Sequence, residues 1–127
     1  MNESILTSIK KLLGIAEEYT HFDQDLIIYI NTYLRRLYQV GVGVNGFYIS
    51  DSSAMWNDFL GENPEKYEQA KTYVYLRVRQ LFDPPQSGAA NEAIKENIRE
   101  LEWLLFVEAD PPVDEVPWGP RTYDEDE

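Results

Sequence analysis

The spacing of apolar side chains along the chain predicts a small all-α protein, a bundle of four to five helices. Within residues 3–13 and 20–40, apolar residues recur every three or four positions, and a glycine follows each segment. A glycine after an apolar stripe is typical of a helix end, because glycine adopts the left-handed conformation without a steric cost. We expect Thr20 or Asp23 to cap the second of these helices.

The segment 39–50 breaks the helical pattern. Its glycines alternate with valines and lead into an aromatic run, which predicts a long glycine-rich loop or a short hairpin. Gly41–Gly46 also match the G-x-G-x-x-G fingerprint of dinucleotide-binding proteins, but that fingerprint needs a strand before it and a helix directly after it. Here a predicted helix precedes the glycines and F-Y-I-S follows them. We therefore interpret them as turn residues that permit positive φ.

The second half of the chain predicts three more helices. The cluster Ser50–Ser53 offers N-caps for a short helix that Gly61 ends, and Asn63 followed by proline is typical of the next helix start. This fourth helix, about 64–82, is apolar on more than one face, so it is either central in the bundle or in contact with another chain. Ser87 is expected to cap the fifth helix, and a D-P-P triplet follows each of the last two.

Length and charge divide the chain into a body and a tail. The 127 residues make one domain, which we place at 1–109, and the segment 110–127 is an extended acidic C-terminal tail. Residues 108–127 hold eight acidic side chains and one arginine, so they contribute −7 to the net charge of −12. The tail either docks on a partner or is a disordered, solubilising segment when free. Its apolar residues are the candidate anchors: Val113, Val116, Trp118 and Tyr123.

The chemistry-bearing residues do not favour catalysis. The chain has no cysteine and one histidine, His21, whose spacing to other polar residues supplies no partner for general-base or metal-ligand work. We expect no enzyme activity, no cofactor and no metal. The chain has no apolar run of membrane-spanning length and no secretory signal pattern, so we expect a soluble protein without membrane contact, made in the cytoplasm.

Arginines and tyrosines cluster on the second and fourth helices, which are also the most apolar. Both residue types are enriched where proteins meet, so these side chains are candidates for contacts between subunits. The alternative is that they are ordinary surface arginines whose stems lie along apolar neighbours. The candidates are Arg35, Arg36, Tyr73, Tyr75, Arg77 and Arg79.

Three blocks of sequence resemble a known family. They are F-D-Q-D-L-I-I-Y-I-N at 22–31, Q-V-G-V-G-V-N-G-F-Y-I at 39–49 and K-T-Y-V-Y-L-R-V-R-Q-L-F-D-P-P at 71–85. In this order, followed by an acid-rich last helix, they resemble the small head-to-tail connector proteins of siphophages and prophages of Gram-positive bacteria. The resemblance covers about residues 4–107, and its blocks are helical patterns without a catalytic signature.

The resemblance implies a virion structural protein, an all-helical adaptor without catalysis. Such adaptors form a ring, commonly of twelve subunits, under the portal protein and above a stopper or tail-completion protein, and double-stranded DNA passes through without sequence-specific binding. The family's gripping elements fall on the C-terminal segment 111–123 and on the loop, whose glycines we interpret as hinges for assembly. The loop residues are Gly41, Val42, Gly43, Val44, Gly46, Phe47 and Tyr48.

Two other functions remain open from the sequence. An acidic protein-binding module or DNA-mimic inhibitor, acting as a monomer or dimer, would have a similar size and charge. A helix-turn-helix DNA binder would need a basic face, and a chain with a net charge of −12 offers little support for one.

Overall fold

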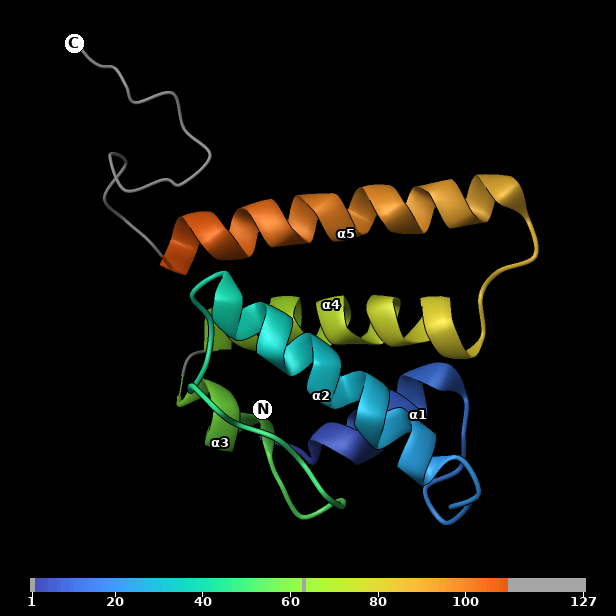
Figure 1. Ribbon diagram of the computed structural model, residues 1–127, viewed down its shortest axis with the longest axis horizontal. Helices are drawn as coiled ribbons and strands as arrows, with labels where there is room; N and C mark the ends of the chain where they lie inside the picture. The colour runs from blue at the N-terminus through green and yellow to red at the C-terminus, as the bar shows by residue number, and fades with distance from the viewer. Residues whose placement is uncertain (1, 63, 110–127) are drawn as a thin grey trace, which may run out of the picture.

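The computed structural model describes residues 2–62 and 64–109 (Figure 1). In this part of the chain it contains helices and no strands, which confirms the predicted all-α class. The predicted cap at Asn63 and the tail 110–127 lie outside the described residues. The helices are α1 (Ile5–Leu13), α2 (Asp23–Gln39), α3 (Trp56–Leu60), α4 (Pro64–Phe82) and α5 (Gly88–Ala109).

Both ends of α1 are capped by short local contacts. The Ser4 hydroxyl accepts a hydrogen bond from the Thr7 amide at 3.1 Å, which satisfies one of the free N–H groups of the first turn. At the other end Gly14 adopts φ 82°, the left-handed conformation that the sequence predicted. The chain therefore turns sharply after Leu13, and a short connection leads to α2.

The start of α2 corrects one prediction, because neither Thr20 nor Asp23 caps it through its side chain. The helix begins at Asp23, directly after Phe22. The Asp23 carboxylate forms an ion pair with the Lys10 ammonium at 2.9 Å. A buried cation binds this carboxylate more strongly than a backbone N–H at an exposed helix end, since water does not compete for it.

Lys10 is the most buried charged side chain of the described residues, with 2% of its surface exposed. Its ammonium donates to the carbonyl oxygens of Glu17 at 2.9 Å and Tyr19 at 2.7 Å, in addition to pairing with Asp23. The two carbonyl oxygens accept hydrogen bonds, and the Asp23 carboxylate supplies the opposite charge. Lys10 therefore fixes the connection between α1 and α2 onto the end of α1.

The short helix α3 starts later than the serine cluster suggested. No side chain of 50–53 caps it; instead the Met55 amide, just before Trp56, donates to the Asp58 carboxylate at 2.9 Å. Asp51 accepts hydrogen bonds from the Ser53 amide and hydroxyl, so it closes a turn of its own. The predicted end at Gly61, with φ 70°, is confirmed.

The long helix α4 lies at the centre of the bundle, which explains why it is apolar on more than one face. It packs against α1, α2, α3 and α5, and in Figure 1 it lies between α5 and the layer that α1 and α2 form. Leu81, expected on the apolar stripe, is exposed at its end. The buried α4 side chains are Tyr67, Ala70, Tyr73, Val74, Leu76 and Val78.

Helix α5 forms one edge of the molecule and packs mainly on α4 (Figure 1). It begins where predicted, since the Ser87 hydroxyl accepts a hydrogen bond from the Ala90 amide at 3.2 Å. Ile94, Ile98 and Leu105 form its buried stripe. Leu101 and Glu102 are partly buried beside this stripe, and most other described side chains of α5 are exposed, so the helix also presents an outer surface.

Candidate assembly surface

The glycine-rich loop between α2 and α3 is anchored at both ends to α2. At its start the Val42 amide donates to the Leu37 carbonyl at 2.9 Å. At its end the Asn31 side chain accepts from the Ile49 amide at 2.7 Å and donates to the Ile49 carbonyl at 2.9 Å. The loop alternative of the sequence analysis is therefore confirmed over the hairpin.

Two predicted contact residues of the loop make contacts inside the protomer. Val42 is buried, so it has no surface to offer to a neighbouring ring. Gly43, with φ 88°, packs directly on the buried ring of Phe59. We correct the earlier view of these positions: Val42 is an anchor, and Gly43 is a glycine because the Phe59 ring leaves no room for a Cβ.

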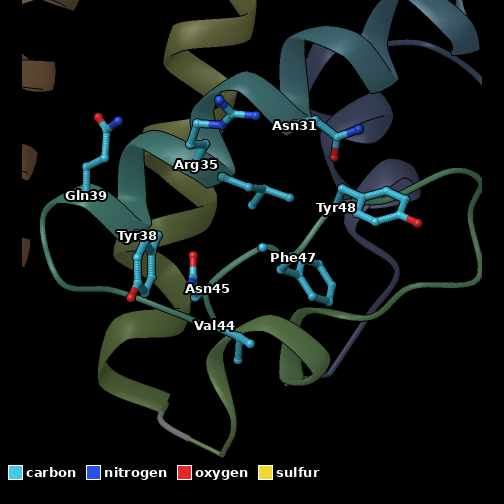
Figure 2. Close-up of a pocket in the computed structure, with 10 residues that line it drawn as sticks. Asn31, Arg35, Tyr38, Gln39, Val44, Asn45, Phe47 and Tyr48 are labelled. Carbon is cyan, nitrogen blue, oxygen red and sulfur yellow. The ribbon is translucent and has the colours of Figure 1, made fainter.

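The middle of the loop is exposed and forms one wall of a groove. Val44 and Tyr48 have 52% and 70% of their surfaces exposed, which is high for apolar and aromatic residues. With the C-terminal half of α2 they enclose a hollow of about 490 Å³, which we call the loop groove (Figure 2). Its lining residues are Asn31, Leu34, Arg35, Tyr38, Gln39, Val44, Asn45, Gly46, Phe47 and Tyr48.

Arg35 is the one charged side chain that lines the loop groove. It is exposed, and in the described part of the chain it has no ion-pair or hydrogen-bond partner. Figure 2 shows it above the groove on the same helix as Tyr38. The groove therefore combines an apolar floor with one uncompensated positive charge, the combination that protein interfaces favour.

Three other predicted interface residues are bound within the protomer by Glu102 of α5. The Glu102 carboxylate accepts hydrogen bonds from the Tyr73 hydroxyl at 2.6 Å and from Arg77 Nη2 at 2.9 Å, and Arg36 Nε lies 3.5 Å away. Tyr73 is fully buried, so the structure places it in the core and not at a surface. We call this set the Glu102 cluster; it joins α5 to α2 and α4.

The Glu102 cluster is charged at neutral pH. Burial, and then the hydrogen bond to Glu102, raise the pKa of Tyr73 to about 12. Burial alone would raise the pKa of Glu102, but the hydrogen bonds from Tyr73, Arg77 and Arg36 outweigh it and lower that pKa below its ordinary 4.5. Tyr73 is therefore a neutral donor and Glu102 an ionised acceptor, and their hydrogen bond helps to hold α5 against α4. No spacing in the sequence marked Glu102 as their partner.

The remaining predicted pair, Tyr75 and Arg79, lies one turn apart on α4. Arg79 Nη1 is 3.4 Å from the Tyr75 hydroxyl, and both side chains are half-buried. Both are therefore still partly available to a neighbouring chain. Of the four predicted arginines, Arg35 is the one that the described residues leave without a partner.

A second exposed apolar surface lies on α5. Trp103 and Leu104 have 54% and 38% of their surfaces exposed, and charged side chains flank them. Arg99 forms an ion pair with Glu96 at 2.5 Å, whereas Glu100 has no partner among the described residues. We call Glu96, Arg99, Glu100, Trp103 and Leu104 the α5 patch. The sequence placed Trp103 off the buried stripe of its helix but assigned it no role.

Within residues 2–62 and 64–109, no group of three or more histidine, aspartate or glutamate side chains is arranged to hold a metal ion. None of the helices described there is both long enough and apolar enough to cross a bilayer. The predicted tail anchors, from Val113 to Tyr123, lie outside the described residues.

Comparison with known protein families gives a match over most of the chain. The family model described as phage connector protein matches residues 5–112, which is most of the chain and includes all five helices. No curated protein and no solved structure matches the chain.

Proposed function

The chain belongs to the phage connector protein family, and on this premise we propose that it is the adaptor that joins the phage head to the tail. In this proposal it forms a ring under the portal protein and above a stopper or tail-completion protein. The ring belongs to the virion, is assembled in the host cytoplasm and leaves a passage for double-stranded DNA. Its work is structural, as is that of the family.

The observation that carries the proposal is the pair of exposed apolar surfaces on a small acidic protein. The loop groove exposes Val44 and Tyr48, and the α5 patch exposes Trp103 and Leu104. Apolar and aromatic groups gathered in this way mark contact sites with other proteins. A ring adaptor needs several such sites, because each subunit meets two neighbours and the rings above and below.

The loop is the proposed contact with an adjacent ring. Its ends are fixed to α2 through Val42 and Ile49, while Val44, Gly46 and Tyr48 project between them. Gly46, with φ 76°, has open space where a Cβ would stand, so no neighbouring atom packs against the outer turn there. We assign the inter-ring contact to this outer turn, and we withdraw the buried Val42 from it.

The acidic tail is the second proposed contact with a ring component. It carries large apolar side chains in a segment too polar to form a core of its own, and seventeen residues follow Asp110. Fully extended, seventeen residues span on the order of 55 Å. Trp118 is the proposed main anchor, since tryptophan contributes most to interfaces of this kind.

Electrostatics supports passage of DNA without binding. The net charge of −12 repels phosphates, and the arginines Arg36 and Arg77 are occupied by Glu102. A ring of such subunits has no excess of free cations to hold the duplex in place. The proposal therefore assigns the DNA no specific contact.

Native mass spectrometry and negative-stain imaging test this function. The full chain is mixed with the portal protein encoded in the same phage genome, and rings or portal-bound rings are expected. A chain that stays monomeric, ignores the portal and competes with DNA for a DNA-binding protein would contradict the adaptor proposal. That result would support the acidic DNA-mimic inhibitor instead.

A further inference from the structure

We propose that the α5 patch of one subunit docks into the loop groove of the next, with Glu100 pairing with Arg35 and Trp103 packing against the groove's aromatic side chains. This inference rests on the proposed ring and names its subunit contact. The occupant of the groove is thus a second copy of this chain. Four observations carry it: apolar character, charge, position and the difference between the two surfaces.

Both surfaces expose large apolar or aromatic side chains beside polar and charged ones. The loop groove exposes Val44, Tyr38 and Tyr48, and the α5 patch exposes Trp103 and Leu104. A tryptophan that enters an aromatic groove is the usual anchor of a protein interface, because it removes a large apolar area from water.

The free charges of the two surfaces are opposite. In the loop groove Arg35 is without a partner, and in the α5 patch Glu100 is without one, while Glu96 and Arg99 neutralise each other at 2.5 Å. Two copies brought together in this way neutralise both free charges at once. Such complementarity selects the orientation of a contact more than it adds to affinity.

The two surfaces lie away from the contact that the Glu102 cluster makes between α2 and α5. Arg36 of α2 faces Glu102 of α5, with 3.5 Å between Nε and the carboxylate. A helix turns by about 100° per residue, so Tyr38 lies about 200° round α2 from Arg36. By the same geometry Leu104 lies about 200° round α5 from Glu102. Arg35 and Trp103 lie about 100° round from Arg36 and Glu102, so both surfaces lie outside the faces by which α2 and α5 meet.

A contact between two different surfaces repeats from copy to copy. Each subunit uses its α5 patch toward one neighbour and its loop groove toward the other, which is the heterologous arrangement of rings. A self-complementary dimer would instead bring the same surface together from both partners. The proposal therefore predicts a chain of contacts, and this difference makes it testable by cross-linking.

The chain has no cysteine, so introduced thiols report the contact without background. The variant R35C/E100C is treated with a short bis-maleimide reagent. We expect a ladder of covalent multimers, because every subunit carries both halves of the contact. An equal mixture of R35C and E100C chains should stop at the dimer, and R35C alone should remain monomeric.

The matched control is R35C/E92C. Glu92 is exposed on the same helix but lies two turns from Glu100, about 12 Å along the axis. This variant should give no ladder above the level of random collision. A dimer from R35C alone would show an isologous contact, and equal ladders from both double variants would show collision. Either result would overturn the proposal.

Charge reversal provides a second measurement. R35E or E100R alone should weaken self-association about tenfold, and the double variant R35E/E100R should restore it. Both side chains are exposed, so circular dichroism and thermal unfolding should not change. Two variants that weaken association separately but fail to rescue each other would contradict the pairing.

The outcomes separate this inference from the adaptor function. If the wild-type chain forms rings but R35C/E100C gives no ladder beyond the Glu92 control, this pairing of surfaces is wrong and the adaptor proposal stands. If the ladder appears but the wild-type chain forms neither a ring nor a portal complex, the self-contact stands and the adaptor proposal fails.

Discussion

Gly43 lies so close to the ring of Phe59 that a β-carbon built on residue 43 would stand 2.2 Å from Phe59 Cζ. Phe59 is buried and also packs against the ring of Phe47, with 5.2 Å between centroids. The backbone at Gly43 is therefore held against the core, although Gly43 itself is exposed. Gly46 differs, since no atom lies within 4 Å of the position of its missing β-carbon.

This contrast predicts different effects for two similar substitutions. Gly43→Ala should lower the free energy of unfolding by about 1–3 kcal/mol, because the methyl group must displace a buried ring and the backbone φ is positive. Gly46→Ala should cost about 1 kcal/mol, the conformational cost alone. Urea unfolding followed by circular dichroism measures both. Equal losses would show that the Phe59 ring moves freely.

The exposed half of the loop should matter for assembly and not for stability. The variant Val44→Ser/Tyr48→Ser removes apolar surface that the protomer does not bury. Its free energy of unfolding should remain within about 0.5 kcal/mol of the wild-type value. Ring or portal-complex formation, followed by native mass spectrometry, should be lost. A fully assembling variant would remove the outer turn from the proposed contacts.

The Glu102 cluster makes stability depend on pH. Because the pKa of Glu102 in the folded chain is below the ordinary 4.5, the folded state binds the proton of the Glu102 carboxyl less tightly than the unfolded state does. The carboxylate therefore adds stability that is fully present above pH 4.5 and is lost as the pH falls below 4.5 through the lowered pKa.

Glu102→Gln isolates this contribution. At pH 7 the variant should be less stable than wild type by about 1–3 kcal/mol, the usual effect of hydrogen bonds to a charged group. The difference should shrink below pH 4.5, where the wild-type carboxylate becomes protonated. Urea unfolding of both proteins at several pH values measures it, and other carboxylates cancel in the comparison. A difference that does not vary with pH would show that ionisation of Glu102 does not stabilise the fold.

Lys10 and Lys11 are adjacent lysines with opposite environments, so they form a matched pair. Lys10→Met should lower the free energy of unfolding by about 2–3 kcal/mol, because it leaves the Asp23 carboxylate and two carbonyl oxygens without their donor. Lys11→Met, on the exposed side of α1, should change it by less than about 0.5 kcal/mol. Thermal unfolding compares the two variants directly. Similar losses would show that the contacts of the Lys10 ammonium do not stabilise the fold.

The proposed tail contact is tested at its main anchor. Trp118→Ala should leave the thermal unfolding of the helical body unchanged and weaken portal or stopper binding about tenfold or more. Tyr19→Ala, an exposed aromatic residue remote from the tail in sequence, serves as the control for unspecific loss of aromatic surface. Isothermal titration with the isolated partner ring measures both. Equal binding by Trp118→Ala and wild type would leave the tail without a role in docking.

Much of the fold was predictable because local rules decided it. The apolar stripes fixed the existence of the helices, and glycines or D-P-P triplets marked most of their ends. The predicted N-caps at Thr20, Asp23 and Ser50–Ser53 were wrong. Asp23 pairs with Lys10 and Asp51 with Ser53, so these side chains bind partners other than a helix terminus, whereas no contact in the described residues explains Thr20.

The candidate site was predicted less well, because its residues are brought together by packing. The loop and Arg35 could be chosen from their residue types, but nothing local separated Arg35 from Arg36. Only the position of α5 does so: it supplies Glu102 to Arg36 and leaves Arg35 free. Val42 and Tyr73 were expected at contacts for their apolar and aromatic character, and the same character placed them in the core.

The sequence by itself determined the all-α class, the glycine-rich loop, the acidic balance and the resemblance to the connector family, since periodicity, turn residues and composition are properties of the chain. The tertiary structure decided which apolar side chains are buried within the protomer and which are exposed. Which side chains are buried depends on the helices that surround α4 and on which face of α5, the one that carries Glu102, packs against α4. Burial is a property of neighbours far apart in sequence, so only the packed bundle could assign it.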